Sequence, residues 1–157
     1  GRRDREGSLD RLVFCKALKS RTSETLRNGI GVGNMEYRIV GLDHVLLAAP
    51  PGSEDLARAF YCGLLGMKEI AKPAQLQKNG GVWFQCGSHE LHIGIQEPFI
   101  AAIKAHPAIA VKNAQLMMKR LQSQGVEAIL DQARDHVFRF YVMDPFGNRL
   151  EMMESLT

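Results

Sequence analysis

Short runs of apolar residues, separated by turn-forming residues, dominate the chain from Tyr37 onward. Runs of roughly four to eight apolar and β-branched residues, bounded by glycine, proline or polar clusters, predict strands. In the first half such runs lie at 37–49, 67–71, 81–86 and 89–95. Apolar residues four positions apart, which predict a helix, are Leu56, Phe60 and Leu64. Ser53 is a favourable N-cap for this helix, and Gly66 is a natural C-terminal stop.

The second half of the chain repeats this order of elements. It predicts strands at 106–111, 126–130, 137–143 and 149–153, and a helix that Asn113 can cap and Gly125 ends. The order is βαβββ twice, with repeat one at 38–96 and repeat two at 105–155. We therefore predict an α+β fold of one domain, 35–157, in which two βαβββ repeats form a cupped mixed sheet around one cleft.

The repeats place metal-competent side chains at matching positions. His44 lies in the first strand of repeat one and His92 in its last strand, 92 − 44 = 48 residues apart. His106 and Glu151 hold the same places in repeat two, 151 − 106 = 45 residues apart. Pairing of the repeats about a pseudo-twofold axis would bring the four together as a site for one divalent ion, with Fe, Ni, Co, Mn or Zn all suitable.

Strand alternation identifies further candidates for the cleft. Arg139 and Tyr141 share one face of their strand, the more polar one, and are expected to line the cleft beside Glu151. Arg139 is a candidate for binding an anionic substrate, and Tyr141 for donating a hydrogen bond to it. Trp83 and Phe84 are most simply residues of the core.

Charge and cysteine content narrow the classes of protein. Residues 1–34 carry eight Lys or Arg and four Asp or Glu, whereas the remainder carries twelve and thirteen, so the net charge of +3 comes from the N-terminal segment. A nucleic-acid partner is therefore not expected for the core, and no apolar run is long enough for a membrane span. Three cysteines without CxxC spacing are typical of reduced thiols in a cytoplasmic protein.

The N-terminal segment, 1–34, ends in a glycine-rich stretch that precedes Met35. We expect Met35 to be the natural start and residues 1–34 to be a non-native or flexible extension. The alternative is a genuine basic arm.

Several segments resemble one known superfamily. The segment 136–151, HVFRFYVMDPFGNRLE, is similar to the closing hairpin of the glyoxalase, bleomycin-resistance and extradiol-dioxygenase proteins, the vicinal-oxygen-chelate superfamily. ARAFYCGLLGMKEI at 57–70 resembles its first helix and second strand, and GLDHVLLA, HELHIGI and HPAIAVKN resemble its ligand-bearing strands. The resemblance implies that His44, His106 and Glu151 are metal ligands. At His92 it departs from the pattern, because lactoylglutathione lyases carry a Glu there and methylmalonyl-CoA epimerases a Gln.

The resemblance implies an enzyme in which a divalent ion acts as a Lewis acid on two adjacent oxygens of a small substrate. Glyoxalase-like lyase or isomerase chemistry through a metal-stabilised enolate is expected, with Glu151 and Tyr141 as catalytic residues. An Fe(II) ring-cleaving dioxygenase and a metal-free, ligand-sequestering resistance protein are the alternatives. Four-stranded half-sheets leave edges, so a homodimer is expected, with the repeats exchanged between chains or not.

Overall fold

The computed structural model describes residues 37–156 of the chain. The described residues from Gly41 onward form one compact unit. The segment 1–34, for which a flexible extension or a basic arm is expected, lies outside the described residues. Within 37–156, no helix combines the length and apolarity needed to cross a bilayer.

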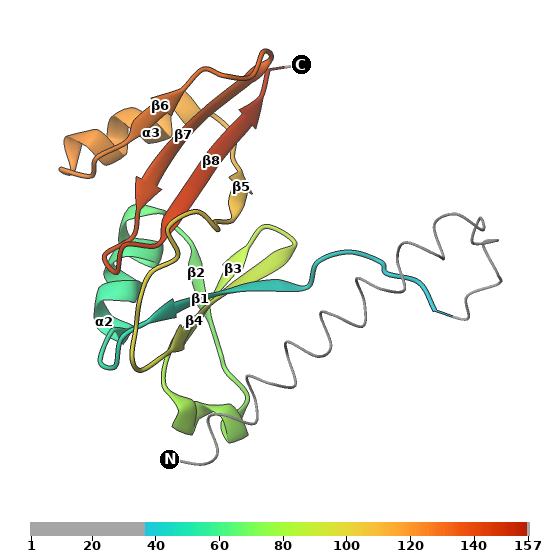
Figure 1. The fold of residues 1–157 in the computed structure, drawn as a ribbon, viewed down its shortest axis with the longest axis vertical. Helices are drawn as coiled ribbons and strands as arrows, with labels where there is room; N and C mark the ends of the chain where they lie inside the picture. The colour runs from blue at the N-terminus through green and yellow to red at the C-terminus, as the bar shows by residue number, and fades with distance from the viewer. Residues whose placement is uncertain (1–36, 157) are drawn as a thin grey trace, which may run out of the picture. The chain divides into compact units, whose positions relative to one another are not determined.

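Each predicted repeat folds into its own four-stranded mixed sheet with one helical layer. Repeat one contains β1 (His44–Ala49), α2 (Glu54–Ala57), the π-helical segment η1 (Arg58–Leu64), β2 (Lys68–Ile70), the 3₁₀ helix η2 (Ala74–Asn79), β3 (Val82–Cys86) and β4 (His89–Ile95). Repeat two contains β5 (Ala108–Ala110), α3 (Ala114–Ser123), β6 (Ile129–Asp131), β7 (Val137–Met143) and β8 (Arg149–Ser155). The strand orders are β1-β4-β3-β2 and β5-β8-β7-β6, so the two sheets have the same topology (Figure 1).

The predicted fold class, two βαβββ repeats of the α+β class, is confirmed. In both sheets the first strand pairs in parallel with the last, and the other pairs are antiparallel. Within residues 37–156 the strands form two separate sheets, and no ladder joins one sheet to the other.

Strands β1, β5 and β6 begin later than the sequence predicts, and β6 starts at Ile129 rather than at residue 126. Strand β1 starts at His44 rather than residue 37, because His44 is opposite Glu90, near the start of its partner strand. Strand β5 starts at Ala108, so His106 precedes the strand instead of lying in it. Pro107 separates the two, and a proline cannot donate a hydrogen bond to a strand ladder.

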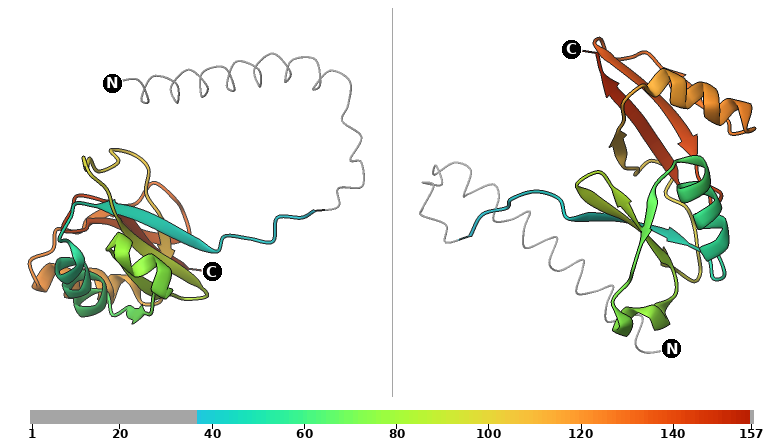
Figure 2. Two further views of the ribbon diagram at one scale, coloured as in Figure 1. Left: turned by 90° about the horizontal axis from the view of Figure 1, so that it is seen from below. Right: turned by 180° about the vertical axis from the view of Figure 1, so that it is seen from behind.

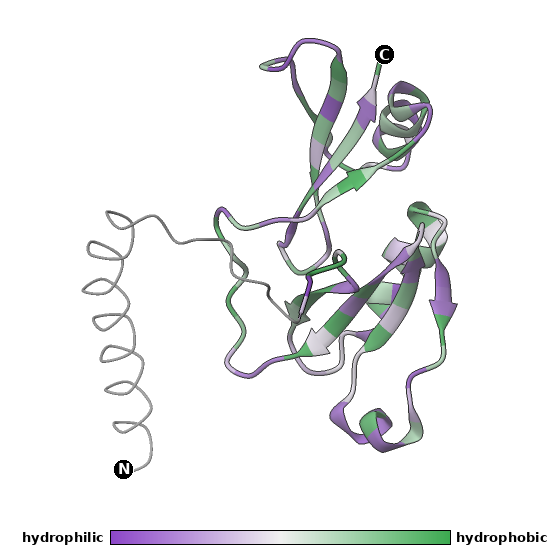
Figure 3. Ribbon diagram, turned by 90° about the vertical axis from the view of Figure 1, so that its right-hand side faces the viewer, coloured by the Kyte–Doolittle hydropathy of each residue, from purple (hydrophilic) through white to green (hydrophobic). Residues whose placement is uncertain are grey.

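One face of each sheet forms the core. Polar and apolar residues alternate along the strands (Figure 3), and the apolar face packs against the helix of the same repeat (Figures 1 and 2). The fully buried side chains on these faces and helices include Tyr61, Phe84, Leu91, Ile93, Leu121, Phe140, Leu150 and Met152. The opposite face of each sheet carries the candidate site residues.

The two predicted N-caps work differently from the expectation. The Ser53 hydroxyl donates to the carbonyl of Pro50 and makes no capping bond to the helix. Asn113 adopts a left-handed conformation without a side-chain cap. The Glu154 carboxylate accepts hydrogen bonds from the N–H groups of Asn113 and Ala114 at 2.8 and 2.9 Å. A carboxylate on β8 thus caps the N-terminus of α3, where its negative charge also interacts favourably with the positive end of the helix dipole.

Buried hydrogen bonds tie the two repeats together. The hydroxyl of Tyr61, on η1, donates to Asp144 Oδ2 at 2.9 Å, and Asn148 Nδ2 donates to the Ala48 carbonyl at 2.9 Å. Asn148 Nδ2 also donates to Asp144 Oδ2 at 2.8 Å. Because these groups are buried, separating the repeats would leave several of them without partners, which is costly.

Candidate metal centre

His106 and Glu151 form a pair on the polar face of repeat two, which we call the second half-site. The Nδ1 atom of His106 lies 2.7 Å from the Lys104 carbonyl, to which it donates, so the ring lone pair is on Nε2. Nε2 faces Glu151 Oε2 at 3.1 Å. A lone pair facing a carboxylate is stable only with a cation or a proton between them. This donor set therefore fits a divalent ion.

Arg139 and Tyr141 surround Glu151, as the strand alternation predicts. Arg139 donates to Asp131 Oδ2 at 2.9 Å and to Glu151 Oε1 at 3.4 Å. Burial raises the pKa of Glu151, but the contacts with the His106 ring and the Arg139 cation outweigh burial, and the net pKa is lowered. Burial raises the pKa of Tyr141, which therefore keeps its hydroxyl proton. Glu151 is thus held as an anion beside a phenol that can donate.

His44 and His92 form a second pair on the polar face of repeat one, the first half-site. Their rings stack with centroids 4.3 Å apart and planes 19° apart. His44 Nδ1 lies 2.7 Å from Asp43 Oδ1, and that hydrogen bond is the main cause of the lowered pKa of Asp43. As in the second half-site, the ring is fixed through Nδ1, so Nε2 carries the lone pair. Metal-binding histidines are commonly held by a carboxylate or carbonyl on their other nitrogen.

The strand registers give the two half-sites equivalent places. In repeat two, Glu151 lies opposite Ala108, two residues after His106. In repeat one, His92 lies opposite Leu46, two residues after His44. His92 therefore stands in repeat one where Glu151 stands in repeat two. Across residues 37–156, however, no three His, Cys, Asp or Glu side chains gather closely enough to hold one ion. The four candidates are brought together as two pairs.

Sequence reasoning missed Glu90, Asp43 and the role of Trp83. Glu90 is opposite His44 in the β1–β4 ladder and lies 2.7 Å from His92 Nε2 through Oε2. Trp83 was expected in the core, but it faces the polar side and stacks on His92, with centroids 3.8 Å apart and planes 2° apart. Strand alternation could have predicted these positions. Residues 90 and 92 lie on the same face of their strand, whereas the adjacent residues 83 and 84 lie on opposite faces.

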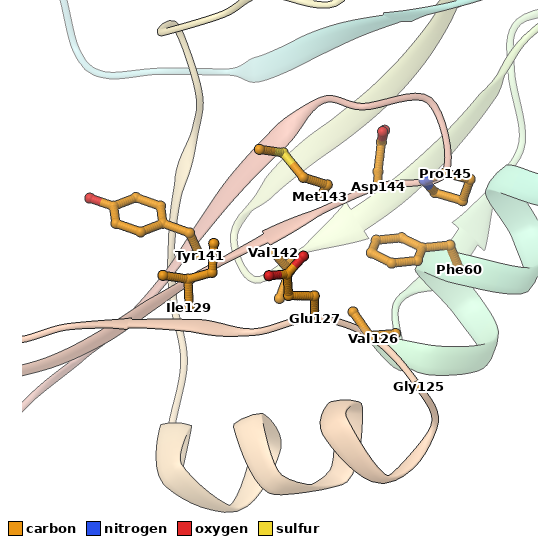
Figure 4. Close-up of a pocket in the computed structure, with 10 residues that line it drawn as sticks. All are labelled: Phe60, Gly125, Val126, Glu127, Ile129, Tyr141, Val142, Met143, Asp144 and Pro145. Carbon is orange, nitrogen blue, oxygen red and sulfur yellow. The ribbon is translucent and has the colours of Figure 1, made fainter.

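Two cavities border the candidate residues. One, of about 320 Å³, lies between η1 and the β6–β7 hairpin, with Phe60 at one end and Tyr141 at the other (Figure 4). The other, of about 410 Å³, is bordered by His44 and Glu90 and by the start of β5. Each cavity reaches residues of one half-site.

The family model of the Glyoxalase/Bleomycin resistance protein/Dioxygenase superfamily matches residues 41–152. The chain belongs to this superfamily. Its members commonly use a divalent metal ion and are typically small-molecule-binding dimers. The match covers both repeats and both half-sites. No curated protein matches the sequence.

Solved structures of the superfamily agree with this assignment. A glyoxalase family protein from Bacillus anthracis shares 52% identity over 77% of this chain and 99% of its own, with a TM-score of 0.75. Lactoylglutathione lyase from Agrobacterium tumefaciens is 19% identical over 75% and 96%, with a TM-score of 0.60. The fosfomycin resistance protein FosX from Mesorhizobium loti is 16% identical over 75% and 94%, with a TM-score of 0.57. The last two likenesses concern the fold alone.

Proposed function

We propose that this superfamily member is a divalent-metal-dependent enzyme of the lyase or isomerase class, acting on a small substrate with two adjacent oxygens. The observation that carries the proposal is the second half-site, where a histidine fixed through Nδ1 aims Nε2 at an ionised carboxylate 3.1 Å away. A divalent ion bound there would act as a Lewis acid toward the substrate oxygens.

The residues around Glu151 suit a substrate on which negative charge is present or develops. The guanidinium carbons of Arg139 and Arg149 lie 5.9 and 5.7 Å from the centroid of the Tyr141 ring. Arg149 shares the face of Glu151, two residues away along β8. Tyr141 would donate a hydrogen bond to a substrate oxygen, and the two arginines would attract its charge.

The complete metal site requires two copies of the chain. Within one chain the two half-sites stay apart, and the buried bonds of Tyr61 and Asn148 hold the repeats in this arrangement. The polar faces also expose apolar side chains, including Leu46, Ile129 and Met143. In a homodimer, the first half-site of one copy would meet the second half-site of the other, and these apolar side chains would be buried at the same time.

Metal analysis tests the proposal. We expect about one divalent ion per chain in the purified protein, and His106→Ala and Glu151→Ala should abolish binding because each removes a donor. His89→Ala is the matched control, since His89 is exposed at the start of β4 and its ring hydrogen-bonds to its neighbour Ser88. Full metal content in both site variants would contradict the site. A wild-type protein that binds no divalent ion, yet binds a small ligand, would instead be a metal-free binding protein.

A further inference from the structure

The two histidines of the first half-site differ in their surroundings. His92 is sandwiched, with the Trp83 indole on one face at 3.8 Å and the His44 ring on the other at 4.3 Å. Its Nε2 is 2.7 Å from Glu90 Oε2, and only 5% of its side chain is exposed. His44 is the outermost ring of this three-ring stack, with 43% of its side chain exposed.

The stack prevents both imidazoles from binding the same ion. The lone pair of an imidazole nitrogen lies in the ring plane, so a bound ion must lie in that plane at about 2.1 Å from the nitrogen. The ring planes of His44 and His92 are only 19° apart and their centroids are 4.3 Å apart, so the two planes intersect much farther from the nitrogens than a metal–nitrogen bond reaches. One of the two rings can therefore serve as a ligand, while the other supports it.

The hydrogen bonds decide which ring is the ligand. His44 is fixed at Nδ1 by Asp43, which leaves the lone pair on Nε2, and the His44 side chain is partly exposed. His92 has its Nε2 occupied by Glu90 and retains only Nδ1, the nitrogen nearer the main chain. We infer that His92 is a positioning residue that holds His44 through the Trp83–His92–His44 stack, and that it is not a ligand. This departs from the sequence-based expectation, in which His92 is a fourth ligand.

The inference deepens the proposed function and rests on it. It leaves His44, His106 and Glu151 as the protein ligands, so the remaining coordination positions are open to both oxygens of a chelating substrate. Two histidines and one carboxylate are also the ligand set of non-haem Fe(II) oxygenases. The ring-cleaving dioxygenase thereby becomes the second candidate function, to be tested by Fe(II)-dependent oxygen consumption with a catechol.

Co²⁺ binding to variants of His92 tests the inference. His92→Phe keeps a flat ring between Trp83 and His44 but has no atom that can bind a metal. We expect its Co²⁺ affinity to stay within about threefold of wild type, with the same visible absorption spectrum. His92→Ala removes the support, and we expect affinity to fall by about 10- to 100-fold, as for other residues that orient a ligand. Trp83→Leu, which removes the other outer ring, should weaken binding in the same direction.

The outcomes separate this inference from the proposed site. If His92 is a ligand, His92→Phe and His92→Ala will weaken Co²⁺ binding equally, and both will change the absorption spectrum through loss of a nitrogen donor. That result overturns the inference and leaves the metal site intact. Failure of wild-type protein to bind Co²⁺ overturns the proposed function itself. Unfolding curves for each variant show whether a loss of binding comes from a loss of folding.

Discussion

At the scale of single residues, alternation along a strand is more informative than composition. Trp83 and Phe84 are both large and aromatic, so both were expected in the core. The β3–β4 register puts Phe84 opposite Leu91 on the helix-covered face and Trp83 opposite His92 on the other. Residue type alone could not separate them, because a tryptophan can stack on an imidazole as well as on a core side chain.

The Tyr61 hydroxyl gives a test at this scale. Burial raises the pKa of Tyr61, so the phenol remains protonated and donates to Asp144. Tyr61→Phe removes this bond but keeps the ring, and Asp144 retains its bond from Asn148. We expect the free energy of unfolding to fall by about 1.5 kcal/mol, equivalent to roughly 3–6 °C in Tm for a chain of this size.

Thermal and urea unfolding at one fixed protein concentration measure the effect, because dimerisation would make stability depend on concentration. Tyr37→Phe is the matched control. Tyr37 is 75% exposed, so its loss of hydroxyl should change stability by less than about 0.5 kcal/mol. Equal stability of the two variants would mean that the buried bond contributes nothing net.

At the scale of elements, the sequence predicts which segments form strands and helices. It does not predict which groups form hydrogen bonds with the backbone at the ends of these elements. All eight strands occur near their predicted positions, because apolar runs and turn residues mark them. The ends depend on partners that are distant in sequence. Strand β1 begins where β4 offers a partner, and α3 is capped by Glu154 from β8 rather than by Asn113. Such pairings cannot be deduced from local sequence.

The start of β3 provides a test at this scale. Gly81 has φ +78°, and a Cβ added to it would lie 2.1 Å from the Ile93 carbonyl oxygen on the neighbouring strand. That oxygen is part of the sheet and cannot move aside as a flexible side chain would. We expect Gly81→Ala to destabilise the fold by about 3 kcal/mol or more, as the sum of the conformational cost and the overlap.

Gly52→Ala separates the two contributions. Gly52 has nearly the same φ, +77°, but nothing lies within 4 Å of the added Cβ. This variant should therefore cost only the conformational penalty, about 1 kcal/mol. The midpoint of urea unfolding for both variants gives the difference. Equal losses at the two positions would show that the contact with Ile93 is relieved by a shift of the strands.

At the scale of the whole molecule, the duplication predicts the kind of site but not the number of chains that form it. The matching positions of His44 with His106 and of His92 with Glu151 follow from the repeat alone. A pseudo-twofold axis can relate two repeats of one chain or repeats of two chains, and the sequence satisfies both. The buried bonds of Tyr61 and Asn148 hold the two repeats together with their half-sites apart, and this arrangement is the reason for proposing a site shared by two chains.

Complementation between inactive variants tests a site shared by two chains. His44→Ala damages the first half-site and His106→Ala the second, so neither homodimer should bind metal. In a mixed dimer, the intact first half-site of the His106→Ala chain meets the intact second half-site of the His44→Ala chain. With random pairing, half of the dimers are mixed, and each has one intact site out of two. Unfolding and refolding the two variants together should therefore restore about a quarter of the wild-type metal content.

The matched control mixes His106→Ala with Glu151→Ala. Both lesions lie in the second half-site, so every site in a mixed dimer carries one of them, and no metal should be recovered. His44→Ala with Glu151→Ala should behave like the first mixture, because its lesions lie in different half-sites. If no mixture recovers metal while the wild-type protein refolds with its full content, each site closes within one chain. The two repeats of one chain would then have to rearrange so that their half-sites meet. That rearrangement would break the hydrogen bond between Tyr61 and Asp144, whose contribution the Tyr61→Phe variant measures.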